Sequence, residues 1–133
     1  MSDMGFTPNL IASGTINPFR FVTISGAFQG AAATAITDEQ IGVTDGSVYK
    51  FDATAHAVAG TPITLQPSNT VQITVGTGGC SAGDYLMPLG SGDGTAVTAA
   101  GGTAVSNYIA LEAGAAGEVI RAFRFGQRGP IFT

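Results

Sequence analysis

The sequence predicts an all-β protein. Residues 109–125 contain an apolar run, a corner of small residues and a second apolar run, a pattern typical of two strands joined tightly. Residues 70–75 alternate strictly, with three β-branched apolar residues on one side and polar residues on the other. The alanine-rich stretch 29–37 has no clear 3.6-residue stripe, so we assign it to strand and loop.

The composition favours a single domain that packs against other proteins. The chain has 133 residues, and only 11% of them are charged, against ~25% in an average soluble chain. The formal net charge of -4 gives no reason to expect a nucleic-acid partner. No apolar run approaches the ~20 residues of a spanning helix, and the N-terminus lacks the pattern of a secretory signal. We therefore expect synthesis in a cytosol and no membrane partner.

Residues 1–17 predict an extended N-terminal arm. The segment is too apolar for a solvated tail, yet its proline cannot donate to a β ladder and disfavours a central strand. An arm that becomes ordered on a partner fits both facts. The alternative is an arm that folds back over its own domain. The candidate contact residues of this arm are Met4, Phe6, Pro8, Leu10 and Ile11.

Residues 18–126 form the expected β domain, built of two related units and a linking strand segment. The units span about 18–60 and 80–126. Each contains an apolar strand, around Phe21 in the first and Tyr85 in the second, followed later by a short apolar step. The spacing between these landmarks differs slightly, and a glycine-rich turn in the second unit accounts for the difference.

Turn and edge signals divide the units further. Asp45-Gly46 is a dipeptide favoured in tight hairpins. Pro62 and Pro67 limit the piece between them to an edge strand or a connection, because proline donates no ladder hydrogen bond. The C-terminal tail, residues 127–133, ends in two apolar residues that dock either onto a neighbour or back onto the sheet. These two candidate contacts are Ile131 and Phe132.

The sequence contains no catalytic constellation and predicts neither a cofactor nor a metal site. His56, the only histidine, has no nearby acid beyond Asp52, so we expect a surface or loop histidine rather than a general base. Cys80, the only cysteine, is expected to be a small buried residue rather than a reactive thiol. The acidic residues lack the spacing of a calcium loop, and the glycine-rich segments precede strands rather than helices. We therefore expect that the protein is not an enzyme.

Three of the five basic residues lie close together near the C-terminus. Arg121, Arg124 and Arg128 fall within eight positions. One interpretation is a basic strip that faces an anion or a partner. The alternative is an exposed strand end with solvated arginines.

Three segments of the chain carry a resemblance to a known family. Residues 109–122, Ile-Ala-Leu-Glu-Ala-Gly-Ala-Ala-Gly-Glu-Val-Ile-Arg-Ala, resemble the closing segment of tailed-phage capsid cement (head decoration) proteins. Gly83-Asp-Tyr-Leu86 and Gln40-Ile-Gly-Val43 look like two further steps of that family. The linking segment 48–79 has no counterpart in the family pattern.

The resemblance implies a small β-barrel or β-tulip-like domain with an extended arm, often assembled as a homotrimer. It also implies a place on the outer capsid surface of a virion, where the protein binds major capsid protein, bridges its subunits and stabilises the shell. An alternative function is a trimeric all-β tail, spike or adhesin module. The lack of tryptophan disfavours a sugar-binding platform in that alternative.

Overall fold

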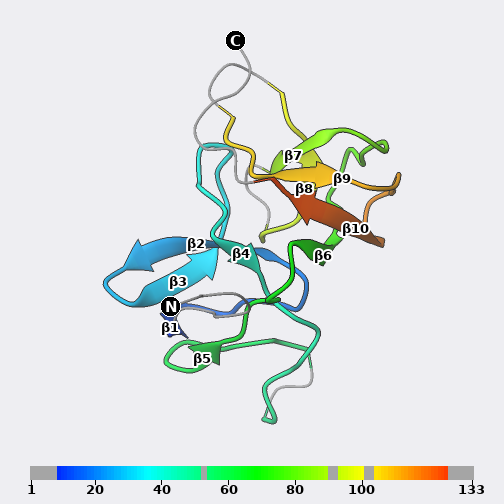
Figure 1. Cartoon of the computed structure of the whole chain (residues 1–133). Coiled ribbons are helices and arrows are strands. Elements are labelled where there is room, and N and C mark those ends of the chain that lie inside the picture. Colours follow the sequence, from blue (N-terminus) through cyan, green and yellow to red (C-terminus); the bar gives the residue numbers. More distant parts are fainter. Residues whose placement is uncertain (1–8, 52–53, 90–92, 101–103, 126–133) are drawn as a thin grey trace.

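The computed structural model describes residues 9–51, 54–89, 93–100 and 104–125 and confirms an all-β fold (Figure 1). These residues form ten strands and no helix. The strands belong to two five-stranded sheets, with the order β4-β2-β3-β1-β5 in the first and β6-β10-β9-β7-β8 in the second. The strands of the first sheet are β1 (Leu10–Ala12), β2 (Phe21–Gly26), β3 (Gln29–Ala32), β4 (Gly42–Val43) and β5 (Pro62–Ile63). Those of the second are β6 (Thr70–Thr74), β7 (Tyr85–Pro88), β8 (Ala96–Thr98), β9 (Tyr108–Ala110) and β10 (Val119–Arg124).

The first sheet curls until its two edges meet. Thr44, next to β4, forms an antiparallel bridge with Leu65, just beyond β5. The Gln66 N–H donates to the Val43 carbonyl at 2.8 Å and extends this contact. We call β1–β5 with residues 64–66 the first barrel. Its buried residues are Leu10, Ala12, Ile16, Val22, Ala57, Ile63 and Leu65.

Two glycines make room for the large side chains inside the first barrel. A Cβ on Gly30 would lie 2.9 Å from Ile63 Cδ1, and a Cβ on Gly42 would lie 2.8 Å from Leu65 Cδ1. Both distances are shorter than a carbon–carbon contact at its optimal separation of ~3.5–4.0 Å. The branched residues of the β5 side therefore fill the centre that these glycines leave open.

The second sheet curls in the same way. Val75, directly after β6, forms a parallel bridge with Ala96 of β8, and the Gly76 N–H donates to the Ala96 carbonyl at 2.8 Å. We call β6–β10 with residues 75–76 the second barrel. The predicted period-2 segment 70–75 is confirmed, since its β-branched apolar residues face the interior. The interior residues are Val71, Ile73, Val75, Leu86, Ala96, Tyr108, Ala110, Ile120 and Ala122.

The two barrels repeat one strand order. In the first, β1 pairs parallel with β3 and antiparallel with β5, and β2 pairs antiparallel with β3 and β4. In the second, β6 bridges β8 in parallel and pairs antiparallel with β10, and β7 pairs antiparallel with β8 and β9. Each strand of the first barrel therefore corresponds to the strand numbered five higher in the second, so β1 matches β6 and β2 matches β7.

This repeat places its boundaries differently from the expected units. The strand β1 lies inside the predicted arm, and β6 lies inside the predicted linking segment, yet each opens a barrel. Residues 9–17 therefore follow the alternative in which the N-terminal segment folds back over its own domain. Residues 1–8 lie outside the described part of the chain.

The barrels share a hydrophobic contact. Phe21 and Val43 are paired across β2 and β4 and point outward from the first barrel, opposite to Val22. Both are fully buried because they pack into the core of the second barrel. The ring centroids of Phe21 and Tyr108 lie 5.3 Å apart. The outer side of one barrel thus completes the core of the other.

Candidate partner-binding surfaces

A buried polar cluster fixes the relation between the barrels. Gln40, fully buried before β4, donates from Nε2 to the carbonyl of Val105 at 2.9 Å and accepts at Oε1 from the Asn107 N–H at 3.0 Å. The Asn107 side chain donates in return to the Gln40 carbonyl at 2.8 Å. These bonds satisfy both ends of the Gln40 side-chain amide and the side-chain nitrogen of Asn107, groups that would lower the stability if left unpaired. The cluster holds the barrels together rather than binding a ligand.

The two described arginines of the predicted basic strip do not lie side by side. Arg121 and Arg124 are three residues apart on β10, so they lie on opposite faces of the sheet. Arg121 is exposed and pairs with Glu112 at 3.1 Å. Arg124 instead donates to the Ile41 carbonyl at 2.8 Å and lies over the Tyr108 ring, which joins the two barrels. Arg128 lies outside the described residues.

The predicted contact residues of the N-terminal arm and the C-terminal tail divide into three groups. Leu10 is 5% exposed inside the first barrel, so its assignment to a partner contact is corrected: it is a core residue. Ile11 points to the outer side of β1 and is 38% exposed, so it remains accessible to a partner. The other predicted contacts, Met4, Phe6, Pro8, Ile131 and Phe132, lie outside the described residues.

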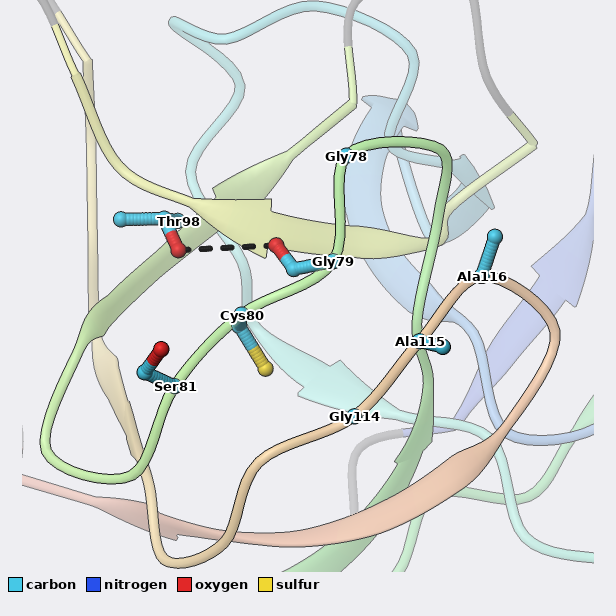
Figure 2. Close-up of a pocket in the computed structure, with 8 residues that line it drawn as sticks. All are labelled: Gly78, Gly79, Cys80, Ser81, Thr98, Gly114, Ala115 and Ala116. Atoms are coloured by element: carbon cyan, nitrogen blue, oxygen red, sulfur yellow. Dashed lines mark hydrogen bonds between the residues drawn. The ribbon is translucent and has the colours of Figure 1, made fainter.

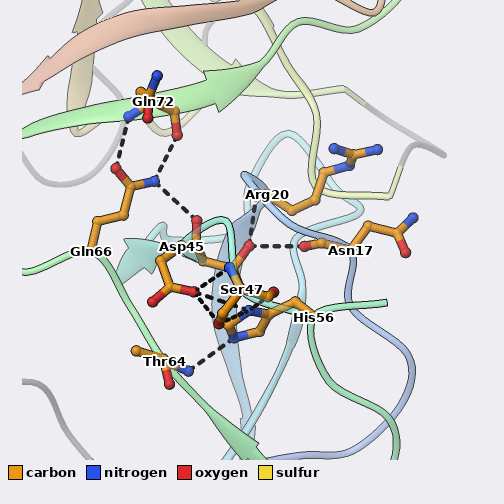
Figure 3. A network of polar contacts seen from close by, with 9 residues as sticks. Asn17, Arg20, Asp45, Ser47, His56, Thr64, Gln66 and Gln72 are labelled. Carbon is orange, nitrogen blue, oxygen red and sulfur yellow. Dashed lines mark hydrogen bonds and ion pairs between the residues drawn. The ribbon is translucent and has the colours of Figure 1, made fainter. Parts of the chain in front are cut away.

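His56 is buried and connects three segments of the first barrel (Figure 3). Its Nε2 accepts the Thr64 N–H at 3.0 Å, so the ring proton resides on Nδ1, which donates to the Ser47 carbonyl at 3.0 Å. Asp45 Oδ1 and Ser47 Oγ both lie 3.4 Å from the same Nδ1. In a catalytic triad, serine and aspartate bind opposite ring nitrogens. This arrangement is therefore a structural connection.

The Asp45-Gly46 dipeptide does not form the expected hairpin. The described residues that follow it, 47–51, contain no strand. The Asp45 carboxylate instead accepts the Ser47 N–H at 3.0 Å, a local turn contact of the kind aspartate favours. The hydrogen bond from His56 to the Ser47 carbonyl holds this segment in a loop conformation in place of the predicted hairpin.

Cys80 lies in an open, shallow pocket of about 520 Å³ on the second barrel (Figure 2). Glycine and alanine supply most of its lining, and the Thr98 hydroxyl donates to the Gly79 carbonyl at 3.5 Å. Burial raises the pKa of the Cys80 thiol, which disfavours the reactive thiolate. The Cys80 backbone exchanges hydrogen bonds with Gly114, at 3.0 and 3.1 Å. The residue joins two loops, and the pocket offers a ligand little to bind.

Within the described ranges, no group of three or more histidine, cysteine, aspartate or glutamate side chains lies together as a metal site. The same residues contain no helix long and apolar enough to cross a membrane.

The outer face of the second barrel carries the main exposed apolar surface. Tyr85, Ile109 and Phe123 are cross-strand neighbours on β7, β9 and β10. Tyr85 and Phe123 are each 40% exposed, and the Phe125 ring meets Tyr85 edge-on at 5.3 Å. We call Tyr85, Ile109, Phe123 and Phe125 the aromatic face. The sequence indicated this face in part. Residues 119–125 have apolar side chains at both odd and even positions, which predicts a strand with two apolar faces.

The β2–β3 hairpin carries a second exposed apolar site at its tip. Phe28 is 79% exposed and adopts a positive φ of 57°, a conformation that non-glycine residues rarely adopt. Ile24, on β2 of the same hairpin, is 53% exposed. Figure 1 shows this hairpin projecting on the side opposite to β9 and β10. Nothing in the sequence singled out Phe28, because strain at a turn is not visible in composition.

Comparison with known proteins gives a likeness in fold and none in sequence family. No protein-family model matches the sequence, and no curated protein matches it. Among solved structures, the chain is similar to the crystal structure of the N base of the head fiber gp8.5 in bacteriophage phi29, with a TM-score of 0.67 and 18% identity. The match covers 90% of this chain and 93% of that one. What the two share is the fold.

Proposed function

We propose that the chain is a structural component of a phage head that binds the outer capsid surface. In this role it binds major capsid protein, bridges its subunits and stabilises the shell, as a homotrimer without a catalytic function and without direct contact to nucleic acid or membrane. The observation that carries the proposal is the fold shared, over 90% of the chain, with a protein whose structure is described as part of a phage head fiber. The resemblance of residues 109–122 to capsid cement proteins points in the same direction.

The surface chemistry supports a role in binding other proteins. Low charge and two exposed aromatic sites favour contacts made by shape and apolar burial rather than by ion pairs. The many copies of a capsid lattice would add modest contacts into a large stabilisation.

The test is binding to empty and DNA-filled heads of the phage whose genome encodes the chain, followed by sedimentation and electron microscopy. We expect saturable binding at regular positions and an increased resistance of the heads to heat or low salt. A deletion of residues 2–8 tests the arm, and it must stop there because deletion as far as residue 15 removes β1. Absence of the protein from heads at high concentration would contradict the proposal.

A second candidate is the attachment base of a longer fiber, and the likeness to a fiber base favours it. Under this function the chain marks a few sites on each head and supports a further protein, whereas a cement protein covers the lattice. Counting copies per head by quantitative mass spectrometry distinguishes the two, since a cement protein requires copies in proportion to the capsid protein.

A further inference from the structure

The contact between the two barrels shows how barrels of this kind bind each other. The first barrel inserts the outer side of its β2–β4 pair, Phe21 and Val43, into the second. The second receives it with Tyr108 and with the β7–β8 connection, where the Gly94 carbonyl accepts the Phe21 N–H at 2.8 Å. One surface inserts and a different surface receives, so the contact is heterologous.

The repeat identifies the inserting surface of the second barrel. Val22 pairs with both β3 and β4, and Leu86 pairs with both β8 and β9, so these two interior residues are equivalent. The preceding residues are then equivalent as well, which matches Tyr85 to Phe21. Tyr85 pairs with Ile109 as Phe21 pairs with Val43. The surface that is fully buried in the first barrel is therefore the aromatic face in the second, where Tyr85 is 40% exposed.

The repeat also identifies the receiving surface of the first barrel. The β7–β8 connection that receives Phe21 is equivalent to the β2–β3 hairpin tip. That tip presents Phe28, the most exposed large apolar side chain among the described residues, and the same hairpin carries the exposed Ile24. Each barrel thus has one surface used within the chain and one that the fold leaves exposed, and both exposed surfaces are apolar.

We infer that the aromatic face binds the β2–β3 tip of a second copy of this chain, head to tail. The contact repeats between chains the arrangement that already joins the barrels within one chain. A head-to-tail contact closes into a ring or extends into a filament, depending on the rotation between copies. It specifies the subunit contact of the proposed homotrimer, but it is tested on the isolated chain and does not require binding to heads.

Two variants block one surface each. Tyr85→Arg places a charge on the aromatic face, and Phe28→Gly removes the tip side chain while relieving its positive φ, so folding is retained. Light scattering over a concentration series is expected to show oligomers for the unmodified chain and monomers for each variant. Phe51→Ser is the matched control, because Phe51 is 76% exposed on a different loop, and it is expected to associate as the unmodified chain does.

Mixing the two blocked variants tests the direction of the contact. Each variant keeps the surface that the other lacks, so the mixture is expected to form dimers and nothing larger. A mixture that remains monomeric overturns the head-to-tail contact. A monomeric unmodified chain at all concentrations, or unimpaired association of both variants with circular dichroism unchanged, overturns the inference altogether.

Discussion

His56 acts at the scale of a single residue as a connection inside the first barrel. Substitution His56→Ala leaves the Thr64 N–H and the Ser47 carbonyl without their partner. We expect the free energy of unfolding to fall by about 1–3 kcal/mol, the usual effect of unsatisfied buried groups. Urea unfolding followed by circular dichroism measures this. Phe51→Ser in the same loop is the control and is expected to change stability by no more than about 0.5 kcal/mol.

The Asp84 carboxylate is a second local contact, and it depends on pH. The Ser81 N–H and the Thr98 hydroxyl donate to it at 2.8 and 2.7 Å and hold the pKa of Asp84 below its ordinary 3.8. A lowered folded-state pKa means that the stabilisation is present above the ordinary value and is lost as the pH falls through the folded value. Asp84→Asn is therefore expected to lower stability at pH 7 by up to about 1 kcal/mol, since the group is largely exposed to solvent.

Urea unfolding at a series of pH values tests whether the charge of the Asp84 carboxylate stabilises the fold. The difference in stability between Asp84→Asn and the unmodified chain is expected to shrink below pH 3.8. A difference that stays constant down to pH 2 would show that the carboxylate charge is not involved.

At the scale of elements, Gly94 allows the barrels to approach. Its φ is +91°, and a Cβ there would lie 2.8 Å from the Phe21 carbonyl oxygen. Gly60, with a φ of +88° and open space around it, separates the two effects. Gly60→Ala is expected to lower the free energy of unfolding by about 1 kcal/mol, and Gly94→Ala by about 2 kcal/mol more because backbone must move. Equal effects in urea unfolding would contradict the role of Gly94 in the contact.

At the scale of the whole molecule, the shared core makes the two barrels one folding unit. Phe21 belongs by chain to the first barrel and by packing to the second. Phe21→Ala is expected to lower the free energy of unfolding by about 3–5 kcal/mol. It is also expected to split one unfolding transition into two, seen as separate groups of amides in hydrogen exchange. A single transition with unchanged cooperativity would show that the polar cluster around Gln40 suffices.

Much of the strand content follows from local pattern. The alternation at 70–75 and the glycine corner after Ile109 predict β6, β9 and β10, because period and turn chemistry act over a few residues. Leu10 and Arg124 could not be placed in this way. Their positions depend on pairing with residues far along the chain, such as Gln29 beside Ile11 and Ile41 beside Arg124. The sequence indicated two apolar faces on β10, but the set of residues that forms the aromatic face depends on the pairing of β7, β9 and β10.

Closure of both sheets has a consequence for the behaviour of the protein at high concentration. Exposed strand edges are the usual templates on which β proteins add further strands and form fibrils. Here the bridges Thr44–Leu65 and Val75–Ala96 bring the outermost strands of each sheet into contact with each other. A chain with few charges to repel its neighbours is therefore expected to stay as discrete particles at high concentration rather than to form amyloid.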